Sequence, residues 1–334
     1  MSAPRIVRLG TADVRFPSPQ LRQIEDSSAL LSDPPALRAA FARDGFVYLR
    51  GALGREAVLA ARGAVVEHLQ AQGNVLREGS TSVLLDSCGL GCLPMMEGAN
   101  AVTADARVAG VLEGAPLRAA VAALLGEAPD ALRTFDYKWL RAMPRKLFTG
   151  AHMDAVYMAR GSPRLLTCWV PFEAAATLEL GALAMYRGSH AAPGGLERLR
   201  ATYGRLDTEA EPGFVGTGWF TEDPAEVAAL DSAPPGSGQE ARGWVSGDYG
   251  AGDVIIFGMH TLHMSTANLT DSVRISCDVR WQAAAEPIDE RYVGTAQELK
   301  DKQAQRKKGG AWAADGGADA SAVSISDLRA KWGV

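Results

Sequence analysis

The chain has 334 residues, of which 47% are hydrophobic and 22% are charged, and its formal net charge is -5. This composition is typical of a folded protein, and the length allows one large domain that encloses a substrate pocket. The mild acidity gives no electrostatic footprint for nucleic acid, and we interpret the basic run over residues 300–308 as a solvated helix face. No run of about 18 apolar residues predicts a membrane span, and the N-terminus lacks the apolar core of a signal peptide. We therefore expect a cytoplasmic protein that acts on a small molecule, and nothing in the sequence indicates its oligomeric state.

The four cysteines do not form a disulfide framework or a zinc site. Cys88 and Cys92 lie in the Gly-rich stretch SCGLGC, without a second pair at the spacing of a zinc site, so a disulfide between them stays open. Cys168 and Cys277 lie in apolar runs and are expected to pack as small hydrophobic side chains.

The first 130 residues predict an N-terminal arm followed by a helical flank. Residues 1–34 are mixed in character and contain prolines, so we expect an arm on the surface. The flank covers residues 35–130. Its predicted elements are, in order, a helix over 36–43, a strand over 46–51, a helix over 55–72, an irregular Gly-rich stretch over 74–112 and a helix over 117–125.

From about residue 132 the apolar spacing changes from that of helices to that of strands. Six short runs are rich in aromatic and β-branched residues, and most have no strong helix between them: 133–143, 152–160, 164–172, 181–188, 253–264 and 273–282. This order favours an antiparallel sandwich or jelly roll with flanking helices over a parallel α/β sheet. We expect a single domain, with a jelly-roll core over 131–285 and a helical tail over 286–334.

A long insertion, residues 191–246, interrupts the predicted core. Long insertions in compact domains are often lids or binding loops. Trp219 and Phe220 make this insertion the best candidate for a lid, and the tail with Trp312 is a second candidate.

The run AHMDAVYM places a histidine and an aspartate two residues apart. In a strand, side chains at i and i+2 point to the same face, so His152 and Asp154 would be presented side by side. An imidazole and a carboxylate together are two thirds of the facial triad that binds non-haem iron(II). The non-functional alternative is that the two residues form a hydrogen-bonded pair on the surface.

A second segment, residues 252–282, supplies a third ligand and a cation. An apolar strand ends at His263, residues 268–271 have turn chemistry, and the following strand carries Arg274. A hairpin would bring Arg274 back beside the strand of His263, where its planar fork suits a carboxylate such as the distal one of 2-oxoglutarate.

The last strand alternates cleanly, with four polar side chains on one face: Arg274, Ser276, Asp278 and Arg280. Taken alone, such a strand favours a polar face that sees only water. His260 is a rival ligand to His263, but the two are three residues apart and point to opposite faces of a regular strand.

These segments together resemble the phytanoyl-CoA dioxygenase family of iron- and 2-oxoglutarate-dependent oxygenases. The resemblance covers about residues 36 to 285 and rests on the following positions: His152 and Asp154; Thr167 to Phe172; Gly181, Ala182 and Leu183; Gly188, Ser189 and His190; and Gly252, Asp253, His263, Ser265, Asn268, Thr270 and Arg274. It implies a double-stranded β-helix, which is a jelly roll. It also implies iron(II), 2-oxoglutarate and dioxygen as cofactors.

The resemblance further implies roles for single residues. His152, Asp154 and His263 would hold the iron, and Arg274 would bind 2-oxoglutarate. Ser265, Trp169 and Thr167 would contact the cosubstrate. The remaining candidates for substrate contacts or the lid are Lys138, Arg141, Tyr157, Met158, His190, Trp219 and Phe220. For Lys138 and Arg141 a solvent-facing position is the alternative, and for His190 a structural hydrogen bond is favoured.

The expected reaction is hydroxylation of an unactivated C–H bond of a small organic molecule, a secondary metabolite among the options, with release of succinate and carbon dioxide. Desaturation, epimerisation and ring formation stay open, because the same cofactors support them. Met153 departs from the bulky polar residue usual between the two ligands. The carboxylate of Asp154 argues against the halogenating branch, and no coenzyme A site is recognisable. The rival classes are a non-catalytic cupin-like metal-binding protein and an enzyme with another metal.

Overall fold

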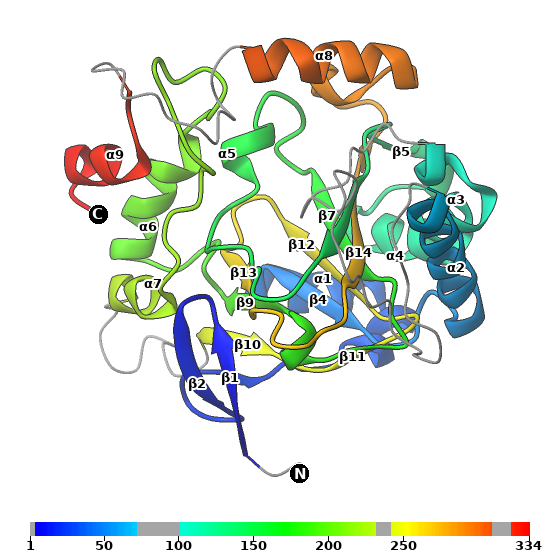
Figure 1. Cartoon of the computed structure of the whole chain (residues 1–334), viewed down its shortest axis with the longest axis horizontal. Helices are drawn as coiled ribbons and strands as arrows, with labels where there is room; N and C mark the ends of the chain where they lie inside the picture. The colour runs from blue at the N-terminus through cyan, green and yellow to red at the C-terminus, as the bar shows by residue number, and fades with distance from the viewer. Residues whose placement is uncertain (1–3, 72–100, 232–241, 309–321) are drawn as a thin grey trace.

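The computed structural model describes residues 4–71, 101–231, 242–308 and 322–334, and two β-sheets form its centre (Figure 1). The larger sheet has the strand order β4-β12-β7-β14-β5, and β6 also pairs with β14. Its strands are β4 (Phe46–Leu49), β12 (Val254–Gly258), β7 (Leu166–Pro171), β14 (Arg274–Ala283), β5 (Leu132–Thr134) and β6 (Trp139–Met143).

The smaller sheet has the order β13-β9-β10-β3. Its strands are β13 (His263–Ser265), β9 (Leu183–Arg187), β10 (Gly243–Ser246) and β3 (Arg22–Gln23). Two further pairs are the hairpin of β1 (Arg5–Leu9) with β2 (Ala12–Phe16), and β8 (Ala175–Ala176) with β11 (Tyr249–Gly250). Apart from the parallel pair β10 and β3, the pairings are antiparallel, as the sequence predicts for a jelly roll.

Helices surround the sheets, and four of them cover the outer face of the larger one (Figure 1). The helices are α1 (Pro34–Asp44), α2 (Arg55–Ala71), α3 (Ala106–Leu112), α4 (Ala115–Leu125), α5 (Ala155–Met158), α6 (Gly195–Ala201), α7 (Pro224–Leu230), α8 (Ala296–Lys308) and α9 (Ile325–Trp332). Short 3-10 turns lie at Ser28–Ser32, Ala101–Ala104, Pro129–Ala131, Leu178–Leu180, Tyr203–Arg205 and Glu290–Tyr292.

Helix α1 shows how local sequence sets an element. The side chain of Asp33 accepts a hydrogen bond from the backbone N–H of Ala36, and Pro34 occupies the first turn. The helix ends at Gly45, whose φ of 84° is the left-handed conformation that glycine adopts at little cost. The next residues form β4, so helix and strand follow each other closely.

Strand β14 separates two cores. Its outward side chains, Ile275, Cys277, Val279 and Trp281, are buried against the helices of the flank. Its inward side chains are polar and are buried as well. The polar face of this strand is therefore not exposed to bulk water, although the alternating sequence of the strand alone favours exposure.

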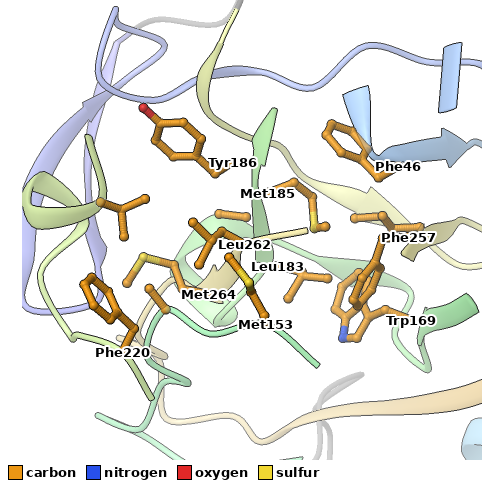
Figure 2. Close-up of a cluster of buried hydrophobic side chains, with 14 of the residues drawn as sticks. Phe46, Met153, Trp169, Leu183, Met185, Tyr186, Phe220, Phe257, Leu262 and Met264 are labelled. Atoms are coloured by element: carbon orange, nitrogen blue, oxygen red, sulfur yellow. The ribbon is translucent and has the colours of Figure 1, made fainter. Parts of the chain in front are cut away.

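The second core lies between the two sheets. Figure 2 shows Trp169 and Phe257 of the larger sheet beside Leu183 of β9, while Met264 of β13 lies on the side of Phe220. This core supports the inward face from which the functional side chains project.

Several predicted elements differ in the structure. Residues 1–34 are more than a surface arm, because the β1–β2 hairpin buries Val7, Leu9 and Phe16 in the inner core. The predicted strand after His152 is mostly the short helix α5. Helix α3 lies within the stretch expected to be irregular.

The predicted hairpin between the strands of His263 and Arg274 is also wrong. Strand β13 pairs with β9 in the smaller sheet, whereas β14 pairs with β7, β6 and β5 in the larger one. The chain crosses between sheets here, as it does between β12 and β13, so Arg274 reaches the site from the opposite sheet. In addition, β10 belongs to the smaller sheet although it falls inside the predicted insertion.

Among the described residues, one helical stretch, Ala106–Leu125, is long and apolar enough by length and composition to cross a membrane. It is divided at residues 113–114 into α3 and α4. Their apolar side chains, such as Val108 and Leu117, are fully buried in the outer core. We therefore interpret the stretch as core helices. Cys168 and Cys277 are free and buried in this fold, while Cys88 and Cys92 lie outside the described residues.

Candidate metal centre

The segments of two histidines are joined by a backbone bridge. The N–H of His152 donates to the carbonyl of His263 at 3.0 Å, and the N–H of His263 donates back at 3.1 Å. The two ring centroids lie 4.1 Å apart. Asp154 follows as the first residue of the turn into α5 rather than as part of a strand. The three side chains nevertheless meet, and their ligand atoms all lie within 4.8 Å of one another.

Backbone carbonyls orient both imidazoles. Nδ1 of His152 lies 2.8 Å from the carbonyl of Gly150, and Nδ1 of His263 lies 3.0 Å from that of Thr261. A carbonyl can only accept, so Nδ1 of each ring carries the proton and the lone pair is on Nε2. Each Nε2 lies 3.7 Å from Oδ1 of Asp154, which is too long for a hydrogen bond. Two imidazole nitrogens and one carboxylate oxygen, all able to bind a metal, thus face one point without hydrogen bonds between them.

Burial sets the protonation states of the three ligands. It lowers the pKa of His152 to about 3, helped by the neighbouring His263, and it also lowers the pKa of His263. Burial alone would raise the pKa of Asp154, but the charge of Arg280, the two histidines and a hydrogen bond from Thr167 outweigh it and hold that pKa well below its usual range. Neutral imidazoles and an ionised carboxylate are the forms that bind a divalent cation.

A cavity lies at the triad, between the inner faces of the two sheets. It is lined by Arg141, Thr149, His152, Asp154, Trp169, Leu183, Phe257, His263, Ser265, Arg274, Asp278 and Arg280. The lining carries three arginines but only two aspartates, and an unpaired buried charge is costly, so the balance of charge indicates an anionic occupant.

Among the three arginines of the cavity, Arg274 has the fewest partners to neutralise its buried charge. Its side chain comes from the start of β14, is 2% exposed and lies with its guanidinium carbon 5.8 Å from the centre of the Trp169 ring. Its Nε has no hydrogen-bond partner among the described residues. Burial, together with the nearby charge of Arg141, lowers its pKa to about 10, so the group stays charged at neutral pH. A carboxylate of a cosubstrate would satisfy it.

Of the other predicted cosubstrate contacts, Ser265 and Trp169 line the cavity, while Thr167 does not. The hydroxyl of Ser265 accepts a hydrogen bond from the backbone N–H of Thr149 at 2.8 Å, so its own proton is free for a ligand. The hydroxyl of Thr167 instead donates to Oδ2 of Asp154 at 2.5 Å. Thr167 therefore contacts the metal ligand, which corrects the predicted contact with the cosubstrate.

The two predicted cations before the metal segment have different positions. Arg141 lines the cavity, and its Nε donates to Oδ2 of Asp278 at 2.9 Å. Lys138 is 3% exposed, pairs with Glu113 at 2.9 Å and does not line the cavity. The expectation of a substrate contact is thus wrong for Lys138, because this residue precedes β6 and its amine is held by Glu113 and the carbonyl of Phe135.

Most of the remaining candidate residues have structural roles. The ring of Tyr157 packs edge-on against His152 at 5.7 Å, and its hydroxyl donates to the carbonyl of Thr217 at 2.7 Å. Met158 is buried in the inner core and does not line the cavity. His190 bonds the carbonyl of Ala42 at 3.0 Å, which is the structural role that the sequence favours. His260 lies outside the triad.

The insertion packs on the metal segment rather than standing free of it. The N–H of Ala151 donates to Thr221, and the N–H of Phe220 donates to Ala151, both at 2.8 Å. Phe220 is 1% exposed and packs in the inner core, a position that favours a structural role over the predicted lid role. Trp219 stacks near Phe148 at 6.2 Å and stays a lid candidate. Trp312 lies outside the described residues.

Sequence reasoning missed Arg280 and Asp278 as parts of the site. Arg280 donates to Oδ2 of Asp154 at 3.1 Å, and Asp278 holds Arg141. The signal was present, since both residues share the polar face of the strand with Arg274. Taken alone, the strand favours exposure of this face to water, because the sequence does not show that the strand is central.

Comparisons with known proteins agree with this geometry. The family model for phytanoyl-CoA dioxygenase matches residues 41–276. No match was found among curated proteins. The carbocyclase SnoK from nogalamycin biosynthesis, a non-haem α-ketoglutarate-dependent protein, has a similar structure with a TM-score of 0.51, 19% identity and coverage of 80% of this chain and 89% of SnoK. The epimerase SnoN, in complex with Fe3+, α-ketoglutarate and nogalamycin RO, gives a TM-score of 0.50 at 22% identity, with coverage of 79% and 87%.

At these identities the two structures establish the fold, while the family match spans more than half of the chain. The matched residues contain the larger sheet except for most of β14, and they contain the whole triad. The chain therefore belongs to the phytanoyl-CoA dioxygenase family and is an iron- and 2-oxoglutarate-dependent oxygenase.

Proposed function

We propose that this enzyme oxidises an unactivated C–H bond of a small organic molecule, with hydroxylation as the outcome, and that His152, Asp154 and His263 hold its iron. The observation that supports the site most is the convergence of two neutral imidazoles and one ionised carboxylate on one buried point. Two nitrogen donors and one oxygen donor with open positions suit iron(II), whereas structural zinc sites use four protein ligands.

Arg274 is proposed to bind the distal carboxylate of 2-oxoglutarate, with Ser265 donating a hydrogen bond to it. When bound, iron and 2-oxoglutarate activate dioxygen, and the cosubstrate leaves as succinate and carbon dioxide. The chain's own residues orient and shield this chemistry. Gly150 and Thr261 fix the imidazole rings through their carbonyls, and the Trp169, Leu183 and Phe257 side chains form the apolar part of the cavity wall that excludes water.

Arg141 is the proposed substrate contact, because it lines the cavity beside the triad and is positioned by Asp278. Trp219 is the proposed lid residue. Tyr157, which covers one side of His152, is proposed to close the site on the side of the insertion. We also propose a cytoplasmic location, for which the free and buried Cys168 and Cys277 are the support.

Epimerisation and ring closure are the competing outcomes, because SnoN is described as an epimerase and SnoK as a carbocyclase. Once a substrate is turned over, product mass separates hydroxylation, epimerisation and the loss of two hydrogens. Hydroxylation adds one oxygen atom, desaturation and ring closure each remove two hydrogens, and epimerisation leaves the mass unchanged.

The experiment is an oxygen-consumption and succinate assay on the purified full chain with iron(II) and 2-oxoglutarate, run beside the Asp154→Ala and Arg274→Ala variants. We expect succinate from the wild type and little from either variant. Metal and 2-oxoglutarate binding are measured in parallel by calorimetry, since oxygenases of this kind can idle without substrate. Absence of both succinate and binding would refute the proposal and favour a non-catalytic protein.

A further inference from the structure

The two carboxylate oxygens of Asp154 have different surroundings. Oδ1 faces the two imidazoles and lies 3.7 Å from each Nε2. Oδ2 accepts two hydrogen bonds, from the hydroxyl of Thr167 at 2.5 Å and from Nη2 of Arg280 at 3.1 Å. One oxygen is therefore directed toward the metal position, and the other is occupied by the protein.

The two donors are direct neighbours in the larger sheet. Thr167 on β7 and Arg280 on β14 are cross-strand partners in the register of the sheet. Both side chains project to the inner face and reach the same oxygen atom, and both are buried. Because each donor stands on a central strand, the position of the carboxylate is set by the sheet and not by the loop that carries Asp154.

Asp154 is the one described side chain that accepts a hydrogen bond from the buried Arg280. The side chain of Arg280 is 2% exposed, and its Nε and Nη1 have no hydrogen-bond partner in the described part of the chain. Asp154 accepts its one hydrogen bond, and the other nearby carboxylate, that of Asp278, lies 3.9 Å away. The guanidinium carbon lies 3.9 Å from the centre of the Trp139 ring, which fixes the group in place through a cation–π contact. A buried charge with a single acceptor is costly as a structural device.

We propose that Thr167 and Arg280 are positioning residues that make Asp154 a one-oxygen ligand. They hold Oδ2 away from the metal and thereby leave a coordination position for the cosubstrate or dioxygen. This inference rests on the proposed function of the triad as a metal site. Without the two hydrogen bonds the carboxylate is free to rotate, so the metal binds less tightly and in a different ligand arrangement.

The test is a titration of cobalt(II) into the full-length protein, followed by calorimetry and by the visible absorption of the bound ion. Thr167→Val removes one hydrogen bond at nearly constant volume and charge, and Thr167→Ser keeps the hydroxyl as the matched control. Outer hydrogen bonds to metal ligands change affinity by about 10- to 100-fold. We expect Thr167→Val to weaken cobalt(II) binding about tenfold and to change the absorption spectrum, whereas Thr167→Ser stays within about threefold of wild type.

Arg280→Met and Arg280→Lys extend the test to the second donor. The methionine variant should lose up to about 100-fold in affinity, and the lysine variant should recover part of that loss. Arg118→Met removes a charge of the same sign that packs over Trp281 on the outer face of β14, away from the cavity, so its cobalt(II) affinity should stay near that of the wild type. Circular dichroism shows whether each variant folds, and if Arg280→Met does not, the Thr167 pair decides.

The two proposals fail in different ways. If the wild type does not bind cobalt(II), the metal site itself is wrong. If the wild type binds but Thr167→Val binds equally well with the same spectrum, the positioning role is overturned while the metal site stands. An equal loss in Thr167→Val and Thr167→Ser would also overturn it, because the loss would then come from packing and not from the hydroxyl.

Discussion

The anchoring role of Arg274 can be tested by its removal, and the structure sets the size of the effect. The guanidinium is 2% exposed, its Nε has no partner among the described residues, and it stays charged at neutral pH. Truncating one partner of a buried, hydrogen-bonded charge pair costs about 2 to 5 kcal/mol. At about 1.4 kcal/mol per factor of ten, Arg274→Ala should raise the Kd of 2-oxoglutarate by roughly 30- to 4,000-fold.

Calorimetric titration of 2-oxoglutarate into protein loaded with manganese(II) measures this change. Arg274→Lys keeps a positive charge but loses the planar fork, so we expect a loss between those of the wild type and Arg274→Ala. Arg118→Met is the control, since this arginine packs over Trp281 on the outer face of β14 and lies away from the cavity. A Kd for Arg274→Ala within about threefold of wild type would refute the reasoning, because an anchor worth several kcal/mol cannot be removed at that cost.

Three further predictions concern the fold. Phe220→Ala should lower the free energy of unfolding by about 3 to 5 kcal/mol in urea titrations with little change in the Kd of 2-oxoglutarate, and the reverse pattern would restore Phe220 as a lid residue. Leu9→Ala, in the N-terminal hairpin, should cost about 2 to 5 kcal/mol, whereas a neutral result would return that hairpin to a surface arm. Burial lowers the pKa of His190 below its ordinary 6.5, so below that pH the unfolded chain binds a proton that the folded chain does not, and stability falls as the pH falls. His190→Gln should therefore show a shallower loss of stability between pH 7 and pH 5.5 than the wild type, and identical slopes would contradict this assignment.

Much of the strand pattern could be predicted because period and composition are local. The outer face of β14 shows this well, since Ile275, Cys277, Val279 and Trp281 alternate with polar residues and all pack against helices. The triad could also be predicted, because its residue types and spacing carry the chemistry. The side chains of His152 and Asp154 lie close together as predicted, although Asp154 begins a helix and is not part of the predicted strand.

What could not be predicted depends on which strands become neighbours. The sequence around Arg274 is compatible with a hairpin, but the strand joins the other sheet and approaches His263 across the interior. The roles of Thr167 and Arg280 have the same origin, because the cross-strand pairing that joins them spans more than 100 positions. Burial of a polar strand face is likewise a property of the sheet, so Asp278 and Arg280 looked solvent-exposed when the strand was considered alone.

The most direct test of the central claim is the dependence of 2-oxoglutarate binding on metal at the triad. Calorimetry is performed on wild-type protein and on Asp154→Ala, each with and without manganese(II). We expect one metal ion per chain in the wild type, 2-oxoglutarate binding only after that ion is bound, and loss of both in Asp154→Ala. Binding of 2-oxoglutarate that is equally tight without metal, or metal binding that survives loss of Asp154 unchanged, would contradict the assignment of His152, Asp154 and His263 as the metal centre.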